Sequence, residues 1–135
     1  MIDAEIIKIA SDTKFAGLKN TYTHKSSVKN SLCGDSIKIE LIVGKKFIKS
    51  MRYETESCIL CEAAASLLAR KIKYFYLKDL KKDFCKIKKL IKDRKFNSST
   101  KFKEFNQLLN KANDNRINCV ILPIEAILKA FKIRK

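Results

Sequence analysis

The chain is poor in the residues that interrupt regular structure. Its 135 residues include three Gly and one Pro, with no internal repeat and no low-complexity linker, so a single domain over residues 1–135 is expected. Apolar residues make up 46% of the chain, enough for a core without disulfides. The polar region 1–31 is the least defined part. The single histidine, His24, is interpreted as a surface residue.

Long apolar runs are also missing. No stretch approaches the length of a membrane span, and the early acidic start, MIDAEIIKIASDTK, does not resemble a secretory signal peptide. These features predict a cytoplasmic protein that does not associate with a membrane.

Arginine is scarce beside lysine. The formal net charge is +16, but it comes from 25 Lys and only 5 Arg. Recognition of bases and phosphates favours the bidentate guanidinium group of Arg. The composition therefore indicates a solvated basic surface, and nucleic acid is not expected as the main partner. The same surface is a candidate for docking an acidic face of a partner protein.

Five cysteines stand out against this background: Cys33, Cys58, Cys61, Cys85 and Cys119. An odd number of cysteines in a chain with no recognisable leader argues against a disulfide framework and favours thiol or metal chemistry in a reducing compartment. Their wide spacing does not match the paired ligands of zinc fingers or ribbons.

The periodicity of apolar residues predicts an α+β fold. Ser36–Val43 alternates apolar and polar residues, and Phe47–Thr55 continues after a Gly-Lys-Lys turn, so the two form an antiparallel hairpin. Leu18–Ser31 contains a candidate third, edge strand. Helices are predicted over Asp3–Ala10, Ile59–Tyr76, Leu80–Ile91, Phe102–Leu109 and Pro123–Phe131. The expected architecture is a small antiparallel sheet of about three strands with helices on one face.

Three of the cysteines fall at the boundaries of these elements. Cys33 lies in a turn-like Leu-Cys-Gly-Asp stretch before the first hairpin strand, Cys58 between strand and helix, and Cys119 before the C-terminal helix. Helix N-termini lower the pKa of a thiol and favour the thiolate, which is both metal ligand and sulfur nucleophile. Such positions can converge at one end of a helix-on-sheet domain. For each cysteine, and above all for mid-helix Cys85, the alternative is a small buried apolar residue.

Three sequence blocks, read in order, resemble a known family. The blocks are LCGDSIKIEL (32–41), ESCILCEAAASLL (56–68) and RINCVILPIEAI (116–127). They resemble the signature blocks of the U-type iron–sulfur cluster assembly scaffolds, which comprise NifU N-terminal domains, IscU and SufU-like proteins. The spacing between Cys58 and Cys119 is closest to the SufU-like branch. Asn118 stands where IscU has a histidine, and the glycines usual before the second cysteine are absent.

The resemblance implies a site and two candidate functions. Its ligands would be Cys33, Asp35, Cys58 and Cys119, with Cys119 the candidate sulfur acceptor. The first function is a scaffold that takes sulfur from a cysteine desulfurase, builds a labile cluster, expected to be 2Fe–2S, and passes it to recipient apoproteins or carriers. The second is a zinc-dependent sulfur acceptor, a sulfurtransferase, with Zn²⁺ on the same ligands; the sequence does not decide between scaffold and enzyme.

Two further interpretations stay open. Cys61 lies one helical turn after Cys58, so it is a candidate additional ligand or sulfur relay, or else a helix residue packed beneath the loop. Alternatively, the whole chain is a degenerate basic interaction module that has lost the cluster and sulfur chemistry of its cysteines. The oligomeric state and the identity of the recipient proteins are not predicted.

Overall fold

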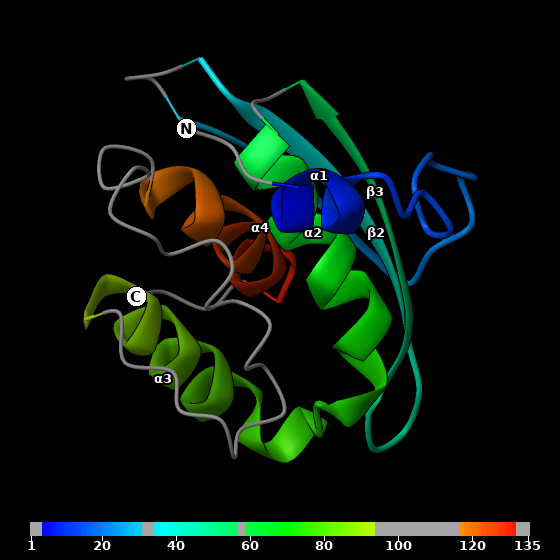
Figure 1. The fold of residues 1–135 in the computed structure, drawn as a ribbon. Helices are drawn as coiled ribbons and strands as arrows, with labels where there is room; N and C mark the ends of the chain where they lie inside the picture. Colours follow the sequence, from blue (N-terminus) through cyan, green and yellow to red (C-terminus); the bar gives the residue numbers. More distant parts are fainter. Residues whose placement is uncertain (1–3, 31–33, 57–58, 94–116, 132–135) are drawn as a thin grey trace.

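The computed structural model describes residues 4–30, 34–56, 59–93 and 117–131. Within these ranges the chain forms a three-stranded sheet and a set of helices (Figure 1). In chain order the elements are α1 Ala4–Ala10, β1 His24–Lys29, β2 Ser36–Val43, β3 Ile48–Glu56, α2 Ile59–Lys71, the 3-10 turns η1 Ile72–Tyr74 and η2 Leu77–Asp79, α3 Leu80–Asp93 and α4 Ile117–Ala130. No helix of the described ranges is long and apolar enough to cross a bilayer.

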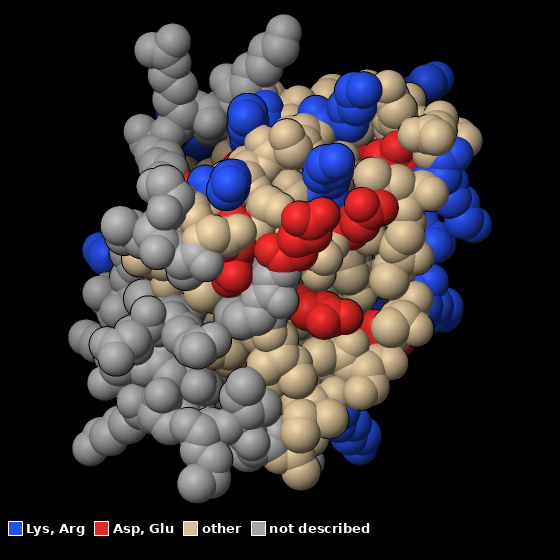
Figure 2. Space-filling model, turned by 90° about the horizontal axis from the view of Figure 1, so that it is seen from above, with Lys and Arg blue, Asp and Glu red and all other residues tan. Residues whose placement is uncertain are grey.

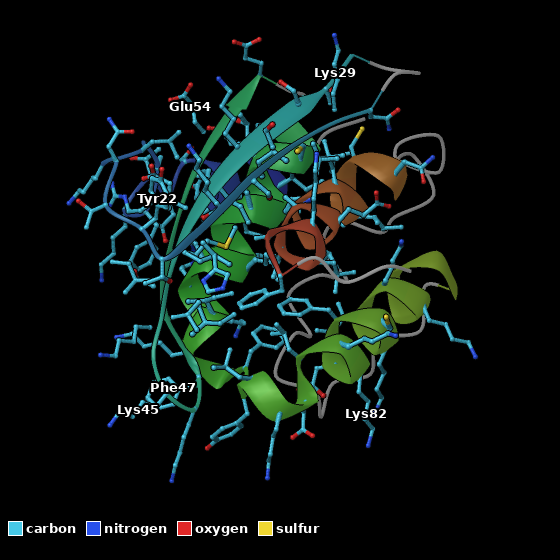
Figure 3. The ribbon with its side chains drawn as sticks, turned by 180° about the vertical axis from the view of Figure 1, so that it is seen from behind. Tyr22, Lys29, Lys45, Phe47, Glu54 and Lys82 are labelled. Atoms are coloured by element: carbon cyan, nitrogen blue, oxygen red, sulfur yellow. The ribbon has the colours of Figure 1, made fainter. Side chains whose placement is uncertain are left out.

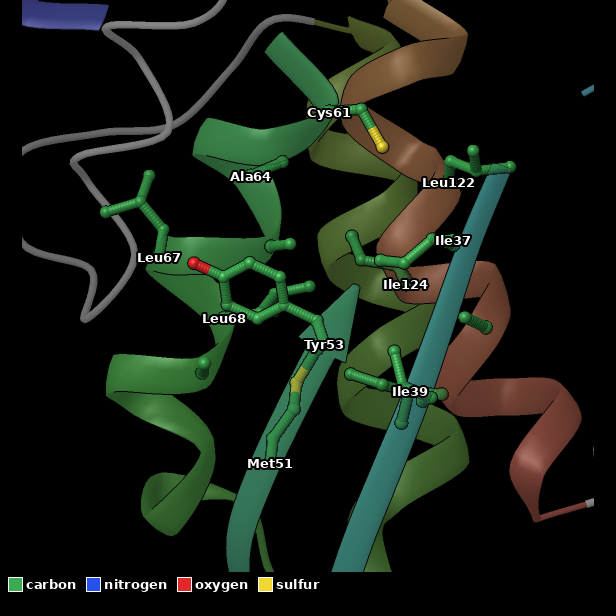
Figure 4. Close-up of a cluster of buried hydrophobic side chains, with 14 of the residues drawn as sticks. Ile37, Ile39, Met51, Tyr53, Cys61, Ala64, Leu67, Leu68, Leu122 and Ile124 are labelled. Carbon is green, nitrogen blue, oxygen red and sulfur yellow. The ribbon is translucent and has the colours of Figure 1, made fainter. Parts of the chain in front are cut away.

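The sheet has the order β1-β2-β3, and both pairs of neighbours are antiparallel. The alternation of apolar residues in β2 places Ile37, Ile39 and Leu41 on one face, and all three are buried. Met51 and Tyr53 of β3 extend the same buried face (Figure 4). The predicted hairpin and the candidate edge strand within Leu18–Ser31 are therefore confirmed, and the fold is α+β as expected.

Helices α2 and α4 cover this face of the sheet (Figures 1 and 4). Helix α2 is buried around almost its whole circumference because α1 and α4 also pack on it. Its alanines, Ala63–Ala65, leave room for close approach of these neighbours. Helix α3 packs on α4 rather than on the sheet. Its Leu80, Phe84 and Ile87 are buried, and the ring of Phe84 stacks on that of Phe75 with centroids 4.1 Å apart.

The segment after α1 closes the edge of β3. The backbone N–H of Gly17 donates to the carbonyl of Tyr53 at 2.7 Å, and Ala16 forms a parallel bridge with Tyr53. The chain then crosses the outer face of the sheet and enters β1 on the opposite edge. This path protects an edge strand that would otherwise offer unpaired backbone groups to other chains.

Two helix boundaries differ from those predicted. Helix α2 ends at Lys71 rather than continuing to Tyr76, because the following segment hydrogen-bonds to the β2–β3 hairpin: the Ile48 N–H donates to the Phe75 carbonyl and the Leu77 N–H to the Lys46 carbonyl. Helix α4 begins at Ile117, not at Pro123, so Pro123 lies inside the helix rather than in its first turn. The predicted helix Phe102–Leu109 lies outside the described residues.

Candidate functional site

Asp35 closes the turn between β1 and β2. The N–H of Asn30 donates to the carbonyl of Asp35 at 2.7 Å, and the N–H of Gly34 donates to the carbonyl of Asn30 at 2.8 Å. Gly34 has a φ of 77°, which an L-residue with a side chain rarely adopts, so glycine fits this turn. The turn places Asp35 in a buried position, with 8% of its surface exposed.

Cys33 and Cys58 lie outside the described residues, but their described neighbours share one end of the sheet. Gly34 and Asp35 follow Cys33 and lead directly into Ser36. The strand register pairs Ser36 with Glu56, the last residue of β3, which precedes Cys58 by two residues. The residues that flank the two cysteines therefore come from adjacent strand ends.

The direction of α4 brings its first turn toward the same end. Ala126 accepts a hydrogen bond from the Ser26 hydroxyl, and the Lys129 ammonium donates to the carbonyl of Ser27. The ring of Phe131 stacks on that of His24 at 4.7 Å. The helix thus runs antiparallel to β1. The distance along the helix axis from Ala126 back to Cys119, the third residue of α4, is about 10 Å. That is roughly the length of β1 from Ser26 to Lys29, about 10 Å, next to the Asp35 turn.

Cys119 lies at the start of α4, as its third residue. Because α4 begins at Ile117, Cys119 lies inside the first helical turn and not before the helix as predicted, and its side chain is only 5% exposed. Pro123, four residues later, has no N–H to donate to the Cys119 carbonyl, so the usual helical hydrogen bond is missing at this point. Asp35 and Cys119 therefore reach the same end of the fold from elements far apart in sequence.

The other candidates are placed differently. Cys61 is fully buried in the core, and its side chain points from α2 toward α4 near Leu122 (Figure 4). Cys85 is half-buried on α3. His24 is half-buried at the other end of β1, where its Nδ1 lies 3.0 Å from the Thr23 hydroxyl. The described residues, which leave out Cys33 and Cys58, contain no cluster of three or more His, Cys, Asp or Glu suited to a metal ion.

Carboxylates surround this end of the molecule, which the sequence interpretation did not single out. Glu54 and Glu56 are exposed at the end of β3, and Glu62 lies in the first turn of α2. Viewed from above, Asp and Glu side chains gather near the middle of this face, although the chain has a net charge of +16 (Figure 2). The sequence did contain a signal for this cluster, because these three glutamates flank Cys58 in an otherwise basic chain. A negative local potential attracts cations.

Comparisons with known proteins identify the family of this chain. The sequence profile of the family described as "NifU-like N terminal domain" matches residues 3–133. The chain belongs to this family. It is 32% identical over 72 residues to the iron–sulfur cluster assembly scaffold protein IscU of Thermotoga maritima. That alignment covers 53% of this chain and 51% of the relative, so the match spans about half the length of that curated protein.

Solved structures of similar proteins share the fold. The N-terminal domain of a NifU-like protein from Brucella abortus aligns with a TM-score of 0.80 at 16% identity, covering 96% of this chain and 91% of that one. A putative scaffold protein for the SUF system from Fervidobacterium islandicum AW-1 also aligns with a TM-score of 0.80, at 19% identity and 96% coverage of both chains. These likenesses place this NifU-like domain in the fold that the three sequence blocks predicted.

Proposed function

We propose that this NifU-like domain, acting as one cytosolic unit over residues 1–135, assembles a labile iron–sulfur cluster as its cargo. The cluster, 2Fe–2S in the simplest case, would be held by Cys33, Cys58, Cys119 and Asp35. Sulfur would come from a cysteine desulfurase, and the product would pass to recipient apoproteins or carriers. The observation that carries the proposal is the buried Asp35 carboxylate at the end of the fold where α4 places Cys119.

The donor set fits a cluster that must be released. Thiolates are soft ligands that bind iron–sulfur clusters strongly, whereas the harder carboxylate of Asp35 is a weaker partner for the same iron. Three thiolates with one carboxylate would therefore hold the cargo less firmly than four thiolates. Glu54, Glu56 and Glu62 support the arrival of iron because a negative rim raises the local concentration of cations.

Cys119 is the proposed sulfur acceptor. It lies in the first turn of α4, where backbone N–H groups and the helix dipole stabilise a thiolate. The thiolate would attack the outer sulfur of a persulfide on the desulfurase and form the persulfide on Cys119. The S–S bond on the desulfurase breaks in the same step, and its cysteine leaves as a thiolate.

A zinc-dependent sulfur acceptor is the second candidate, because the same four ligands suit Zn²⁺. The observation in its favour is Asn118, which is exposed and precedes Cys119 at the position where the IscU branch has a histidine. When bound, zinc would order the thiolates and hold them deprotonated until one is exchanged for incoming sulfur. Cys33, Asp35 and Cys58 would then keep the metal while Cys119 takes the sulfur.

The deciding experiment measures metal and sulfide per chain, with a UV–visible spectrum, in protein purified anaerobically and after reconstitution with iron and sulfide. We expect iron, sulfide and charge-transfer bands in the wild type, their loss in Cys33→Ala, and their retention in the matched control Cys85→Ala. Asp35→Cys should keep the bands and slow transfer of the cluster to an apo-ferredoxin by about tenfold, because a fourth thiolate binds more tightly.

The other outcomes are distinct. Zinc at about one ion per chain, lost in Cys33→Ala and not replaced by iron and sulfide, would support the sulfur acceptor instead. If neither iron nor zinc is bound before or after reconstitution, the remaining interpretation is a degenerate basic interaction module. Equal loss of the bands in Cys85→Ala would contradict the assignment of the ligands.

A further inference from the structure

A groove lies at the hairpin end of the sheet, opposite to the Asp35 turn. Its volume is about 610 Å³, and its lining consists of Lys45, Lys46, Tyr76, Leu77, Lys78 and Asp79. We call it the hairpin groove. It is formed where the turn between β2 and β3 meets Tyr76 and the 3-10 turn η2. Figure 3 shows Lys45 and Phe47 at this end and Lys29 and Glu54 at the other.

Two aromatic rings are exposed beside the groove. Among the described residues, four large apolar side chains are exposed: Ile7, Tyr22, Phe47 and Tyr76. The last two meet edge to face, with ring centroids 6.4 Å apart, while 39% of Phe47 and 51% of Tyr76 remain exposed. Exposed apolar surface that gathers at one place, next to a concave surface, is typical of a binding site rather than of scattered surface residues.

The backbone around the groove is already hydrogen-bonded. Phe47 and Tyr76 form an antiparallel bridge, and the N–H of Leu77 donates to the carbonyl of Lys46 at 2.8 Å. The N–H of Gly44 donates to the carbonyl of Phe47 at 2.9 Å. These bonds fix the hairpin turn to the helical layer, so a ligand would meet a preformed surface of rings and ammonium groups rather than a strand edge.

The charge of the groove is positive. Lys45, Lys46 and Lys78 are all exposed, and Asp79 is the one carboxylate in the lining. The lining holds no Arg, the side chain that recognises phosphate by paired hydrogen bonds. Asp79 can accept hydrogen bonds from the main-chain N–H groups of a peptide, which a phosphodiester backbone does not offer. The chemistry thus favours carboxylates on a peptide.

We propose that the hairpin groove docks an acidic segment of a partner protein. An aromatic or long aliphatic side chain of that segment packs against Tyr76 and Phe47, and flanking Asp or Glu side chains pair with the three lysines. The groove is separated from the Asp35 end by the length of β2, roughly 24 Å. A partner docked here leaves the Asp35 end open, so the domain can hold this partner while a second protein works at that end.

Fluorescence anisotropy of a labelled short peptide, with Asp and Glu on both sides of a central Phe, tests the proposal. The groove variant is Lys45→Gln, Lys46→Gln and Tyr76→Ser in the full chain. The matched control is Lys25→Gln, Lys29→Gln and Tyr22→Ser, which removes the same charge and another exposed ring over which the Lys25 ammonium lies at 5.0 Å. Tyr22 lies apart from Phe47 and Lys45 (Figure 3). Thermal unfolding of all three proteins verifies that they fold.

We expect the wild type and the control to bind the peptide with the same affinity and the folded groove variant to bind at least about tenfold more weakly. Replacing the central Phe by Ser in the peptide should weaken binding to the wild type and to the control, with little further effect on the groove variant. No binding to the wild type at low salt, or equal weakening in both variants, would overturn the proposal. Tighter binding of an oligo-dT of matched length, lost in the groove variant, would overturn it in favour of a nucleic-acid site.

Discussion

Glu40 is a charged residue that the fold uses as an internal anchor. It lies on the outer face of β2, where the alternating pattern assigns polar residues, yet only 4% of it is exposed. The segment that crosses this face covers it: its carboxylate accepts the N–H of Lys19 at 2.8 Å and that of Asn20 at 3.1 Å. Asn20 has a φ of 58°, so these bonds hold a backbone conformation that is otherwise unfavourable.

Replacement of Glu40 by Ala should lower the free energy of unfolding by about 2 kcal/mol, since it leaves two part-buried N–H donors without their charged acceptor. Glu40→Gln keeps one acceptor oxygen and should cost about half as much. Urea denaturation measures both. The control is Glu54→Gln, an exposed change on β3 expected to alter stability by no more than about 0.5 kcal/mol. Equal effects of Glu40→Ala and the control would show that the anchor is unimportant.

Tyr53 illustrates how burial also governs the ionisable groups of the core. Its ring packs between β3 and α2 (Figure 4). Its hydroxyl donates to the Asp12 carbonyl at 3.5 Å. Burial raises the pKa of Tyr53 above the ordinary value of 10.0, against the lowering effect of a hydrogen bond with Ser66. The side chain therefore stays neutral where an exposed tyrosine begins to ionise, and it destabilises the fold only when the pH rises above about 10.

At the scale of elements, one ion pair joins α3 to the rest of the molecule. The ammonium of Lys88 lies 3.3 Å from a carboxylate oxygen of Glu125 on α4, and the two side chains are 9% and 26% exposed. Helix α3 packs on α4 rather than on the sheet, so this pair lies within its main interface. The buried Lys88 depends on Glu125 more than the reverse, because the lysine is farther from water.

Removing one partner of the Lys88–Glu125 pair should therefore be asymmetric. We expect Glu125→Ala to lower the free energy of unfolding by about 3 kcal/mol and Lys88→Met by about 1 kcal/mol, because only the first leaves a buried charge. The double variant should be more stable than the sum of the two losses implies. A double-mutant cycle by urea denaturation measures this coupling, with exposed Lys89→Met as the control. Additivity within about 0.5 kcal/mol would contradict the interpretation.

At the scale of the whole molecule, charge is unevenly distributed. The net charge is +16, yet the end that carries Asp35 also carries Glu54, Glu56 and Glu62, while the hairpin groove at the other end carries three lysines. The overall excess of positive charge repels itself and destabilises the compact state. Lysines also lie at the Asp35 end, where Lys38 pairs with Glu54 across β2 and β3 and Lys29 ends β1, so the carboxylates there offset basic residues.

Screening of this repulsion should stabilise the protein. Raising NaCl from about 0.02 M to about 0.2 M shortens the Debye length and should increase the urea concentration at the unfolding midpoint. In the double variant Lys81→Glu, Lys82→Glu the net charge falls from +16 to +12, because each substitution lowers it by two. The rise of the urea midpoint with salt should therefore be smaller in this variant than in the wild type. A midpoint that falls with salt, or an equal increase in the variant, would show that repulsion between lysines does not limit stability.

The sequence by itself determined the local elements and the family. The alternation in Ser36–Val43 predicted β2 at its observed bounds, and the periodicity of Leu80–Ile91 predicted most of α3, because each pattern reflects one face that must be buried. The blocks around Cys33, Cys58 and Cys119 indicated the NifU-like family before any geometry was known. These features depend on neighbours in sequence and on the chemistry of single side chains.

Only the tertiary structure decided where elements end and what their residues touch. Hydrogen bonds between the hairpin and residues Phe75 and Leu77 end α2 at Lys71. Pro123 lies inside α4 because the packing of this helix outweighs one missing hydrogen bond. The alternation of β2 assigns Glu40 to the solvent-facing side, whereas the segment after α1 covers it and leaves it 4% exposed. Cys61 on α2 and Cys119 on α4 are both buried in the core, and only the packing of these helices shows this. Such contacts join residues more than a hundred positions apart, so a local sequence pattern does not contain them.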